Sequence, residues 1–528
     1  MLLRADPEAG LIDSERWKRM TRAEILHVGN ILNNGYLHCR YLRERGVAAD
    51  SLNVDYRHCQ GQPEWAEVHI HEPVKDWDQD WSEIDLQGFE RPEWFFDVTI
   101  GELDNLARRL GGGAPTPGGG ARNAADAFRE PAGTAKAYAK LRRLAGRTAE
   151  AMGLASLVRD RKRARVETVL DGFGLAPEKT RAVVDKTLAD YAAAYPDRGR
   201  NLDAQDVYDL LPRAAAYAPV LALYKLVHAY SLDPIYPMLG NPGLPFICYE
   251  HGTLREFPFE DSARGRLYAL ALKKAEKVII TNSDCKGAAD RLGLDNCTFI
   301  PHIIDERFFA RRAAPLRERL MRESGAELIL VSPTRHDWKD SWPGHLSMHK
   351  RNDRLIRALG KLFRERPELK MLVVFFDWGQ EAGYSKDLIR ECGFVDKVLW
   401  EPLQSKPAIS EFVNAADIVC DHFNEHCPTF GGIVPEGMAC GKPVLVSFDA
   451  DVHRWCYAEM PPLVSVHETD AILAALKELI DHADARRNLG EAAQDWFRRF
   501  HSADIVIGRL IGVYAEISAR HGWGWTFG

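Results

Sequence analysis

The segment from Pro428 to Val446 joins a glycine-rich turn to a helix-forming run that carries an acidic side chain. The turn is Thr429-Phe430-Gly431-Gly432. Such a turn lets backbone amides approach a phosphate closely, and the amino end of the following helix favours an anion. Glu436 falls in the first helical turn, where a carboxylate can accept hydrogen bonds from paired ribose hydroxyls. The same residues also suit a tight strand–helix junction without a ligand, and both interpretations stay open.

Two cations and a histidine could act on the same anion. Arg335 ends an apolar run that begins at residue 327, and Lys350 precedes a predicted helix at 353–366. Fixed Arg and Lys side chains stabilise the charge that develops on a diphosphate leaving group. His251 follows a buried strand-like run, a place where α/β sheets bind ligands. The alternatives are a solvated charge for Lys350 and a core-edge imidazole for His251.

Alternating strands and helices must position these residues. Residues 24–56 read as strand, Asn/Gly-rich loop, helix and strand, and the loop ends at Gly35. The same alternation resumes over 244–302 and again over 327–447, whereas 133–230 reads as helices without strands. Repeated alternation predicts parallel sheets with helices on both faces. We therefore expect two doubly wound α/β domains with a cleft between them.

These segments resemble the donor-binding region of retaining GT-B glycosyltransferases of the group 1, family 4 type, in the glycogen-synthase and sucrose-synthase-like superfamily. That family shows a Glu, then Gly-Phe-Gly, then a second Glu, then Ala-Met-Ala-x-Gly-x-Pro-Val. Phe430-Gly431 matches the Phe-Gly pair, Glu436 matches the second Glu, and residues 437–444 match the remainder with one Ala-to-Gly change.

Further matches extend the resemblance along the chain. Lys350 begins a segment similar to the family's Lys-Gly-x-x-x-Leu-Ile-x-Ala, with Arg351 in place of Gly. The resemblance is weak over 24–56 and good over 244–309 and 327–517.

The resemblance implies a GT-B architecture, in which two Rossmann-like domains face a cleft and a helical insertion decorates the N-terminal domain. It implies hexosyl or related glycosyl transfer from a nucleotide-diphospho-sugar to an acceptor hydroxyl, with retention, in polysaccharide or glycoconjugate biosynthesis. No metal and no cofactor besides the nucleotide-sugar co-substrate are expected. The implied catalytic residues are His251, Arg335 and Lys350, and the implied donor-binding residues are Gly35, Thr429, Phe430, Gly431, Gly432 and Glu436.

The first Glu of the family pattern is absent, because Pro428 lies eight residues before Glu436. The family assigns that Glu to the transferred sugar, and Glu425 or His426 could substitute. This departure motivates one alternative, a catalytically degenerate GT-B subunit that only binds. A second alternative is a GT-B nucleotide-sugar epimerase, which needs no acceptor. The acceptor itself (a saccharide, a lipid-linked glycan or a protein) is not indicated.

We expect an N-terminal domain at 1–310, with a helical insertion at about 105–235, and a nucleotide-sugar domain at 325–490. The closing helices at 491–528 should cross back to the N-terminal domain. Between Lys136 and Arg165 ten basic residues stand against two acidic ones. A basic helix of this kind can lie on an anionic membrane, and a solvated helical face is the alternative.

Composition excludes several other classes. The formal net charge of −7 argues against a nucleic-acid binder with a broadly basic surface. No run of 18 apolar residues occurs and the amino terminus turns polar at once, so we expect a cytoplasmic protein, peripheral at the inner membrane surface at most. The ten cysteines form no CxxC pair. His345 and His349 lack the Glu of HExxH, so no metal site is expected.

One further segment carries carbohydrate-type chemistry. Asp76, Asp78 and Asp80 alternate with Trp77 and Trp81. This pattern suits a loop that stacks on sugars or attracts cations, and a solvated acidic loop is the alternative.

Overall fold

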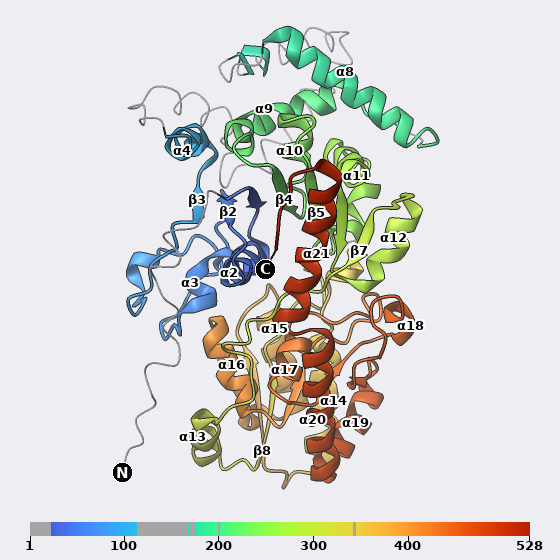
Figure 1. Ribbon diagram of the computed structural model, residues 1–528. Helices are drawn as coiled ribbons and strands as arrows, with labels where there is room; N and C mark the ends of the chain where they lie inside the picture. Colours follow the sequence, from blue (N-terminus) through green and yellow to red (C-terminus); the bar gives the residue numbers. More distant parts are fainter. Residues whose placement is uncertain are drawn as a thin grey trace, which may run out of the picture.

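The computed structural model describes residues 23–112, 166–168, 170–171, 176–198, 201–341 and 345–527. Within these residues, two parallel β-sheets flanked by helices form an upper, N-terminal domain and a lower, C-terminal domain (Figure 1). The predicted α/β fold of two Rossmann-like domains is confirmed.

The N-terminal sheet has seven strands in the order β3-β2-β1-β4-β5-β6-β7, and every neighbouring pair is parallel. Its strands are β1 (Ile25–Val28), β2 (Ala49–Val54), β3 (Phe95–Val98), β4 (Leu226–Tyr230), β5 (Phe246–Tyr249), β6 (Lys277–Ile280) and β7 (Cys297–Phe299). The helices of this domain are α2 (Asn34–Glu44), α3 (Pro63–Glu67), α4 (Leu103–Leu110), α8 (Pro177–Ala194), α9 (Ala204–Leu221), α10 (Ile235–Gly240), α11 (Ala263–Lys274) and α12 (Lys286–Arg291).

Strand β4 corrects the expectation that residues 133–230 contain no strand. It lies at the centre of the sheet, between β1 and β5, and all five of its residues are buried. Its sequence, LVHAY, follows the Ala- and Leu-rich helix α9, so its composition blends with a helical stretch. Its strand conformation is determined by the two neighbours that flank it.

The C-terminal sheet has six strands in the order β10-β9-β8-β11-β12-β13, again all parallel. Its strands are β8 (Leu328–Ser332), β9 (Met371–Phe376), β10 (Val398–Glu401), β11 (Ile418–Cys420), β12 (Val444–Val446) and β13 (Val464–Ser465). The helices of this domain are α13 (Pro315–Ser324), α14 (Asn352–Glu365), α15 (Ala382–Cys392), α16 (Lys406–Ala415), α17 (Ile433–Ala439), α18 (Ala450–His453), α19 (Thr469–Asp481) and α20 (Ala483–Phe500).

The last helix, α21 (Ala503–His521), leaves the C-terminal domain and packs on the N-terminal sheet (Figure 1). Val506, Ile507 and Leu510 join the apolar cluster that contains Ile25 of β1 and Leu226 of β4. Burial of such side chains stabilises the packing by about 25 cal/mol per Å² of apolar surface. The helix therefore ties the two domains together.

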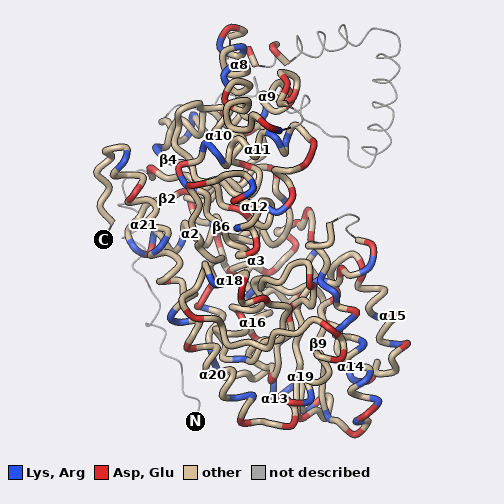
Figure 2. The backbone as a smooth tube through the Cα atoms, turned by 90° about the vertical axis from the view of Figure 1, so that its right-hand side faces the viewer, with Lys and Arg blue, Asp and Glu red and all other residues tan. Residues whose placement is uncertain are grey.

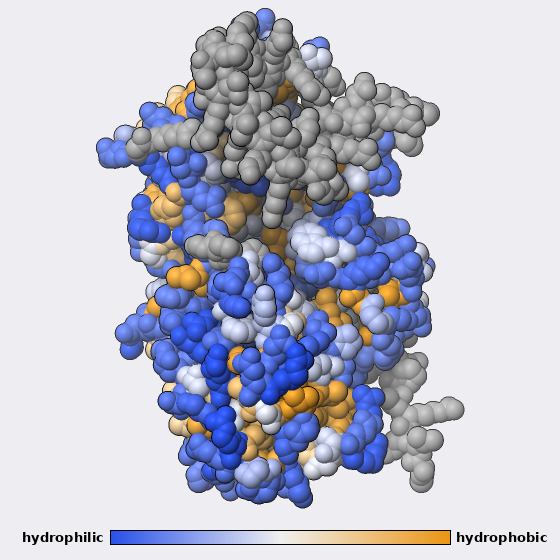
Figure 3. Space-filling model, turned by 180° about the vertical axis from the view of Figure 1, so that it is seen from behind, coloured by the Kyte–Doolittle hydropathy of each residue, from blue (hydrophilic) through white to orange (hydrophobic). Residues whose placement is uncertain are grey.

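Charged residues of both signs are mixed along the backbone of both domains (Figure 2). Seen from behind, hydrophilic residues cover most of the visible described surface, with smaller hydrophobic areas among them (Figure 3). Among the described residues, none of the helices has the length and apolarity that a membrane crossing requires. The basic residues predicted to contact a membrane, at 136–165, lie outside the described residues.

Candidate functional site

Loops that follow the strands of both sheets meet between the domains. The Ser283 and Thr429 hydroxyls, one from each domain, are hydrogen-bonded at 3.2 Å. Ser347 of the C-terminal domain donates to Glu256 of the N-terminal domain at 2.9 Å. Because strand carboxyl ends are the usual ligand-binding edge of a parallel sheet, this junction is the candidate site.

The structure brings Arg335 and Lys350 together, and backbone contacts explain how. The Lys350 amide donates to the carbonyl of Asp337 at 2.6 Å, and its own carbonyl accepts from the Phe423 amide at 3.0 Å. Arg335 donates to the Met348 carbonyl at 2.9 Å and pairs with the Asp337 carboxylate at 2.8 Å. The segment before α14 is thereby fixed against the loop after β8.

Both cations are half-buried. Burial lowers the pKa of Arg335, and the Asp337 carboxylate opposes this. Burial also lowers the pKa of the Lys350 ammonium, and the positive charge of Arg335 lowers it further. Like charges disfavour each other's charged form, and a bound anion would stabilise both cations in addition to the carboxylates already present. The pair is suited to a polyanionic ligand.

The glycine-rich turn lies beside this pair, but one of its amides is already engaged. The Gly431 amide donates to the Asp421 carboxylate at 3.2 Å, and Asp421 also accepts from the Thr334 hydroxyl at 3.1 Å. The Phe430 ring stacks on His453, with 5.3 Å between ring centroids. The Thr429 carbonyl is hydrogen-bonded to His422 at 2.7 Å. The turn is therefore rigid, and Asp421 is a site residue that sequence reasoning missed.

Glu436 lies in the first turn of α17 and is 3% exposed. One carboxylate oxygen forms an ion pair with Lys406 at the start of α16, while Oε2 is buried and has no hydrogen-bond partner among the described residues. Burial raises the pKa of Glu436, and the Lys406 ammonium opposes this rise. An unsatisfied buried carboxylate oxygen is costly, and it is suited to accepting a ligand hydroxyl.

His251 follows β5 on the N-terminal side of the junction. Its ring stacks on His302 with 5.0 Å between centroids, and its Nε2 is buried without a hydrogen-bond partner among the described residues. Burial lowers the pKa of His251, so its imidazole is neutral near pH 7. The preceding residue, Glu250, accepts from the Thr281 amide at 2.8 Å and also from the Gly252 amide, which fixes the loop that carries His251.

Gly35 lies at the start of α2, where the loop after β1 turns into the helix. A Cβ atom at this position would lie 2.5 Å from the Gly29 carbonyl oxygen, so only glycine permits this close approach. Leu32 and Asn33, inside the loop, have φ of +54° and +57°. This packing accounts for Gly35 without a ligand, and its role in donor binding stays a prediction.

Of the residues near Pro428, Glu425 has one carboxylate oxygen engaged by Arg354 at 2.7 Å, while its Oε2 is buried without a hydrogen-bond partner among the described residues. Its role in place of the missing Glu stays a prediction. His345 pairs with Glu256, and the described residues contain no group of three or more His, Cys, Asp or Glu side chains placed to hold a metal ion.

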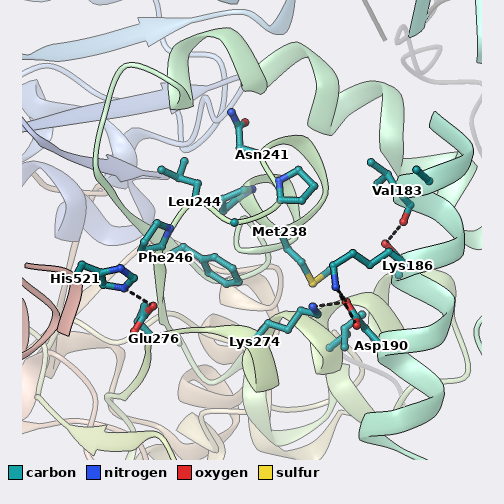
Figure 4. A pocket seen from close by; sticks show the side chains of 17 residues that line it. Val183, Lys186, Asp190, Met238, Asn241, Leu244, Phe246, Lys274, Glu276 and His521 are labelled. Atoms are coloured by element: carbon teal, nitrogen blue, oxygen red, sulfur yellow. Dashed lines mark hydrogen bonds and ion pairs between the residues drawn. The ribbon is translucent and has the colours of Figure 1, made fainter. Parts of the chain in front are cut away.

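A cavity of about 450 Å³ lies elsewhere, between α8, α11, the segment before β5 and the end of α21 (Figure 4). Phe246, the first residue of β5, lines it, so it opens at the amino end of the sheet. Lys186 and Lys274 both pair with Asp190 there, and His521 is hydrogen-bonded to Glu276 at 2.8 Å. None of the predicted site residues lines this cavity, and we assign the site to the junction between the domains.

Part of the chain is similar in sequence to known proteins. Residues 342–496 match the family described as glycosyl transferases group 1. D-inositol 3-phosphate glycosyltransferase of Thermobispora bispora is 28% identical over 185 residues, which cover 34% of this chain and 42% of that protein. The enzyme of that name from Xylanimonas cellulosilytica is 26% identical over 231 residues, which cover 43% and 51%. The chain thus spans about half the length of these curated relatives.

Solved structures with a similar arrangement include sucrose-phosphate synthase from Thermosynechococcus elongatus, with a TM-score of 0.47, 16% identity and coverage of 60% of this chain and 80% of that one. Anabaena Alr3699/HepE in complex with UDP and glucose has a TM-score of 0.46, 17% identity and coverage of 63% and 96%. The family match spans Lys350, the glycine-rich turn and Glu436. Residues 342–496, within the C-terminal domain, are therefore similar to the group 1 glycosyltransferases.

Proposed function

We propose that this protein transfers a glycosyl group from a nucleotide-diphospho-sugar to an acceptor hydroxyl, with retention at the anomeric carbon. The observation that carries the proposal is the half-buried Arg335–Lys350 pair beside the Phe430–Gly432 turn, which suits a diphosphate. The curated relatives are named glycosyltransferases, and this supports the reaction class. The relatives' inositol phosphate acceptor is not carried over, because the matched regions cover only about half of those proteins.

Each part of the donor has a matching group. The diphosphate lies on Arg335 and Lys350, whose fixed positive charges stabilise it as it departs. The ribose hydroxyls donate to the unsatisfied Oε2 of Glu436. The neutral His251 orients the sugar from the other domain. Because Gly431 already donates to Asp421, the phosphates depend mainly on the two cations and less on the turn amides than the sequence predicts.

The reaction then needs neither a protein nucleophile nor a metal. The bond between the anomeric carbon and the diphosphate oxygen breaks, and the acceptor oxygen bonds to that carbon on the same face. The acceptor proton passes to the departing phosphate oxygen. Both cations act in the same step, by stabilising the charge on the leaving group.

A thermal-shift panel of UDP, GDP, ADP and their glucose conjugates tests the proposal. A ligand present at 100 times its Kd stabilises the folded chain by roughly 2.7 kcal/mol. The Arg335→Ala variant should lose most of that gain. Arg366→Ala, at the opposite end of α14 and paired with Asp481, is the matched control and should keep it. An undiminished response in Arg335→Ala, or no response of the wild type to any nucleotide, contradicts the proposal.

Turnover separates this function from its alternatives. Isomerisation of the donor alone, followed by NMR, would indicate an epimerase, and nucleotide binding without turnover of any donor would indicate a binding subunit.

Cytoplasmic location and peripheral contact with an anionic membrane through residues 136–165 belong to the same proposal. Co-sedimentation with vesicles containing phosphatidylglycerol, compared with neutral vesicles, tests that contact.

A further inference from the structure

An exposed tryptophan stands on the N-terminal side of the junction. The side chain of Trp77 is 52% exposed. Its ring makes edge contacts with His58, at 4.9 Å and 88°, and with Tyr56, at 5.9 Å and 80°. The exposed ring of Trp77 thus lies next to two other aromatic rings and forms a local aromatic cluster.

The aromatic group is rigidly mounted. His58 and Trp77 form an antiparallel β-bridge, and the Cys59 amide donates to the Asp76 carbonyl at 2.8 Å. The Tyr56 ring lies directly on Gly61, where a Cβ atom would be 2.3 Å from it. A surface that is fixed before binding loses little conformational entropy when a ligand arrives.

The same segment is tied to the candidate site. Asn30 and Asn33, in the loop before Gly35, donate to the carbonyls of Gly61 and Gln62, each at 2.8 Å. The loop predicted to contact the donor and the segment bearing Tyr56 and His58 are therefore one hydrogen-bonded unit. The positive charge of Arg335 is among the causes that lower the pKa of His58, after burial, so His58 lies within reach of the field of that cation.

We propose that Tyr56, His58 and Trp77 form a platform on which a sugar ring of the acceptor stacks, so that the acceptor is a saccharide. This inference rests on the proposed glycosyl transfer. The C–H face of a pyranose packs on an aromatic ring, whose face carries partial negative charge. The neighbouring Asp76 and Asp78 are exposed, and their carboxylates can accept hydrogen bonds from the sugar hydroxyls. A lipid tail would gain nothing from these carboxylates.

Saturation-transfer NMR on the full chain, with methyl α- and β-glycosides of glucose, galactose and mannose and with maltotriose as probes, tests the platform. We expect saturation of ring C–H protons in at least one probe. Trp77→Ala should weaken that binding by roughly three- to tenfold, the scale of an aromatic contact. Trp77→Phe should retain most of it. Tyr384→Ala is the matched control, because Tyr384 is an equally exposed aromatic residue (49%) on α15 of the other domain.

The nucleotide thermal shift is measured on the same samples and should be equal in wild type, Trp77→Ala and Trp77→Phe. Nucleotide binding together with no glycoside binding, or glycoside binding that Trp77→Ala leaves unchanged, overturns the platform and leaves the proposed function intact. If the wild type showed no thermal shift with any nucleotide, that result would contradict the proposed function instead.

Discussion

The Asp421 carboxylate accepts a hydrogen bond from the Gly431 amide at 3.2 Å, inside the turn predicted to hold a diphosphate. Asp421 is 4% exposed, and its negative charge raises the pKa of Lys350, against the burial that lowers it. The Asp421 carboxylate thus accepts the hydrogen bond of the Gly431 amide and also favours the charged form of the Lys350 ammonium.

Asp421→Asn is expected to move the pH dependence of anion binding. Besides Asp421, the charges that act on Lys350 are Arg335 and Arg255, which lower its pKa, and Cys427, which raises it. Binding of an anion weakens as pH rises through the pKa of Lys350. Without the Asp421 charge that pKa falls, so the weakening should begin at lower pH. Calorimetry with inorganic pyrophosphate from pH 7 to 10 measures this.

The control for that experiment is Asp377→Asn, since Asp377 lies in the same domain and pairs only with the surface residue Lys386 among the ion pairs of the described residues. In this variant the affinity for pyrophosphate should decrease over the same pH range as in the wild type. If the affinity of Asp421→Asn for pyrophosphate decreased over the same pH range as that of the wild type, Asp421 would not determine the pKa of Lys350.

Glu436→Gln should remove the preference for ribose. A hydrogen bond to a charged group contributes about 1.5–3 kcal/mol, or roughly ten- to a hundredfold in affinity. The wild type is expected to prefer UDP, GDP and ADP over their 2′-deoxy forms by such a factor, and Glu436→Gln to bind both forms alike. Glu327→Gln, on an exposed carboxylate paired with Lys370, is the control. A retained preference in Glu436→Gln would place the ribose elsewhere.

The parallel sheets were predictable because buried apolar runs alternate with helical periodicity. That pattern also places Arg335 and Glu436 at one edge of the C-terminal sheet. The Glu436–Lys406 and Gly431–Asp421 contacts were not predictable, because folding brings together residues 30 and 10 positions apart. The position of Asp421 in the sequence nonetheless indicated a site residue, because an acidic residue directly after a buried strand lies at the ligand-binding edge of the sheet. Asp421 directly follows β11, and Glu250 directly follows β5.

Glu250 is expected to act as a positioning residue for His251. It is fully buried and accepts from the amides of Thr281 and Asn282 at 2.8 and 2.9 Å, as well as from that of Gly252. Glu250→Gln leaves part of these donors unsatisfied, which should cost about 2–4 kcal/mol of folding stability. It should also lower kcat while leaving the nucleotide thermal shift unchanged, because the cations belong to the other domain.

The control for Glu250 is Glu276→Gln, which alters a carboxylate beside the remote cavity of the same domain. It should keep the wild-type kcat. If Glu250→Gln lowered nucleotide affinity and kcat equally, a general loss of structure would explain the effect better than displacement of His251.

Three buried histidines, on β1, α2 and β4, should make the protein sensitive to acid. His27 and His38 are each hydrogen-bonded to the Tyr230 hydroxyl at 2.7 Å, and His228 to the Tyr514 hydroxyl at 2.8 Å. Burial lowers the pKa of His27 to about 3, and those of His38 and His228 well below the ordinary value of 6.5. The folded state therefore keeps these imidazoles neutral under conditions in which the unfolded state protonates them.

The sign of the effect follows from linkage. Below pH 6.5 the unfolded chain binds more protons than the folded chain, so the free energy of unfolding falls as pH falls, by up to about 1.4 kcal/mol per pH unit for each such histidine. His228→Gln can still hydrogen-bond to Tyr514 but takes up no proton. Its unfolding free energy is measured by urea titrations between pH 5 and 8. As pH falls, this free energy should decrease less steeply than in the wild type, by up to about 1.4 kcal/mol per pH unit. His482→Gln, at a position exposed to solvent, is the control and should leave the slope unchanged. Equal slopes for wild type and His228→Gln would mean that His228 is already protonated in the folded protein, which its burial within the central strand β4 argues against.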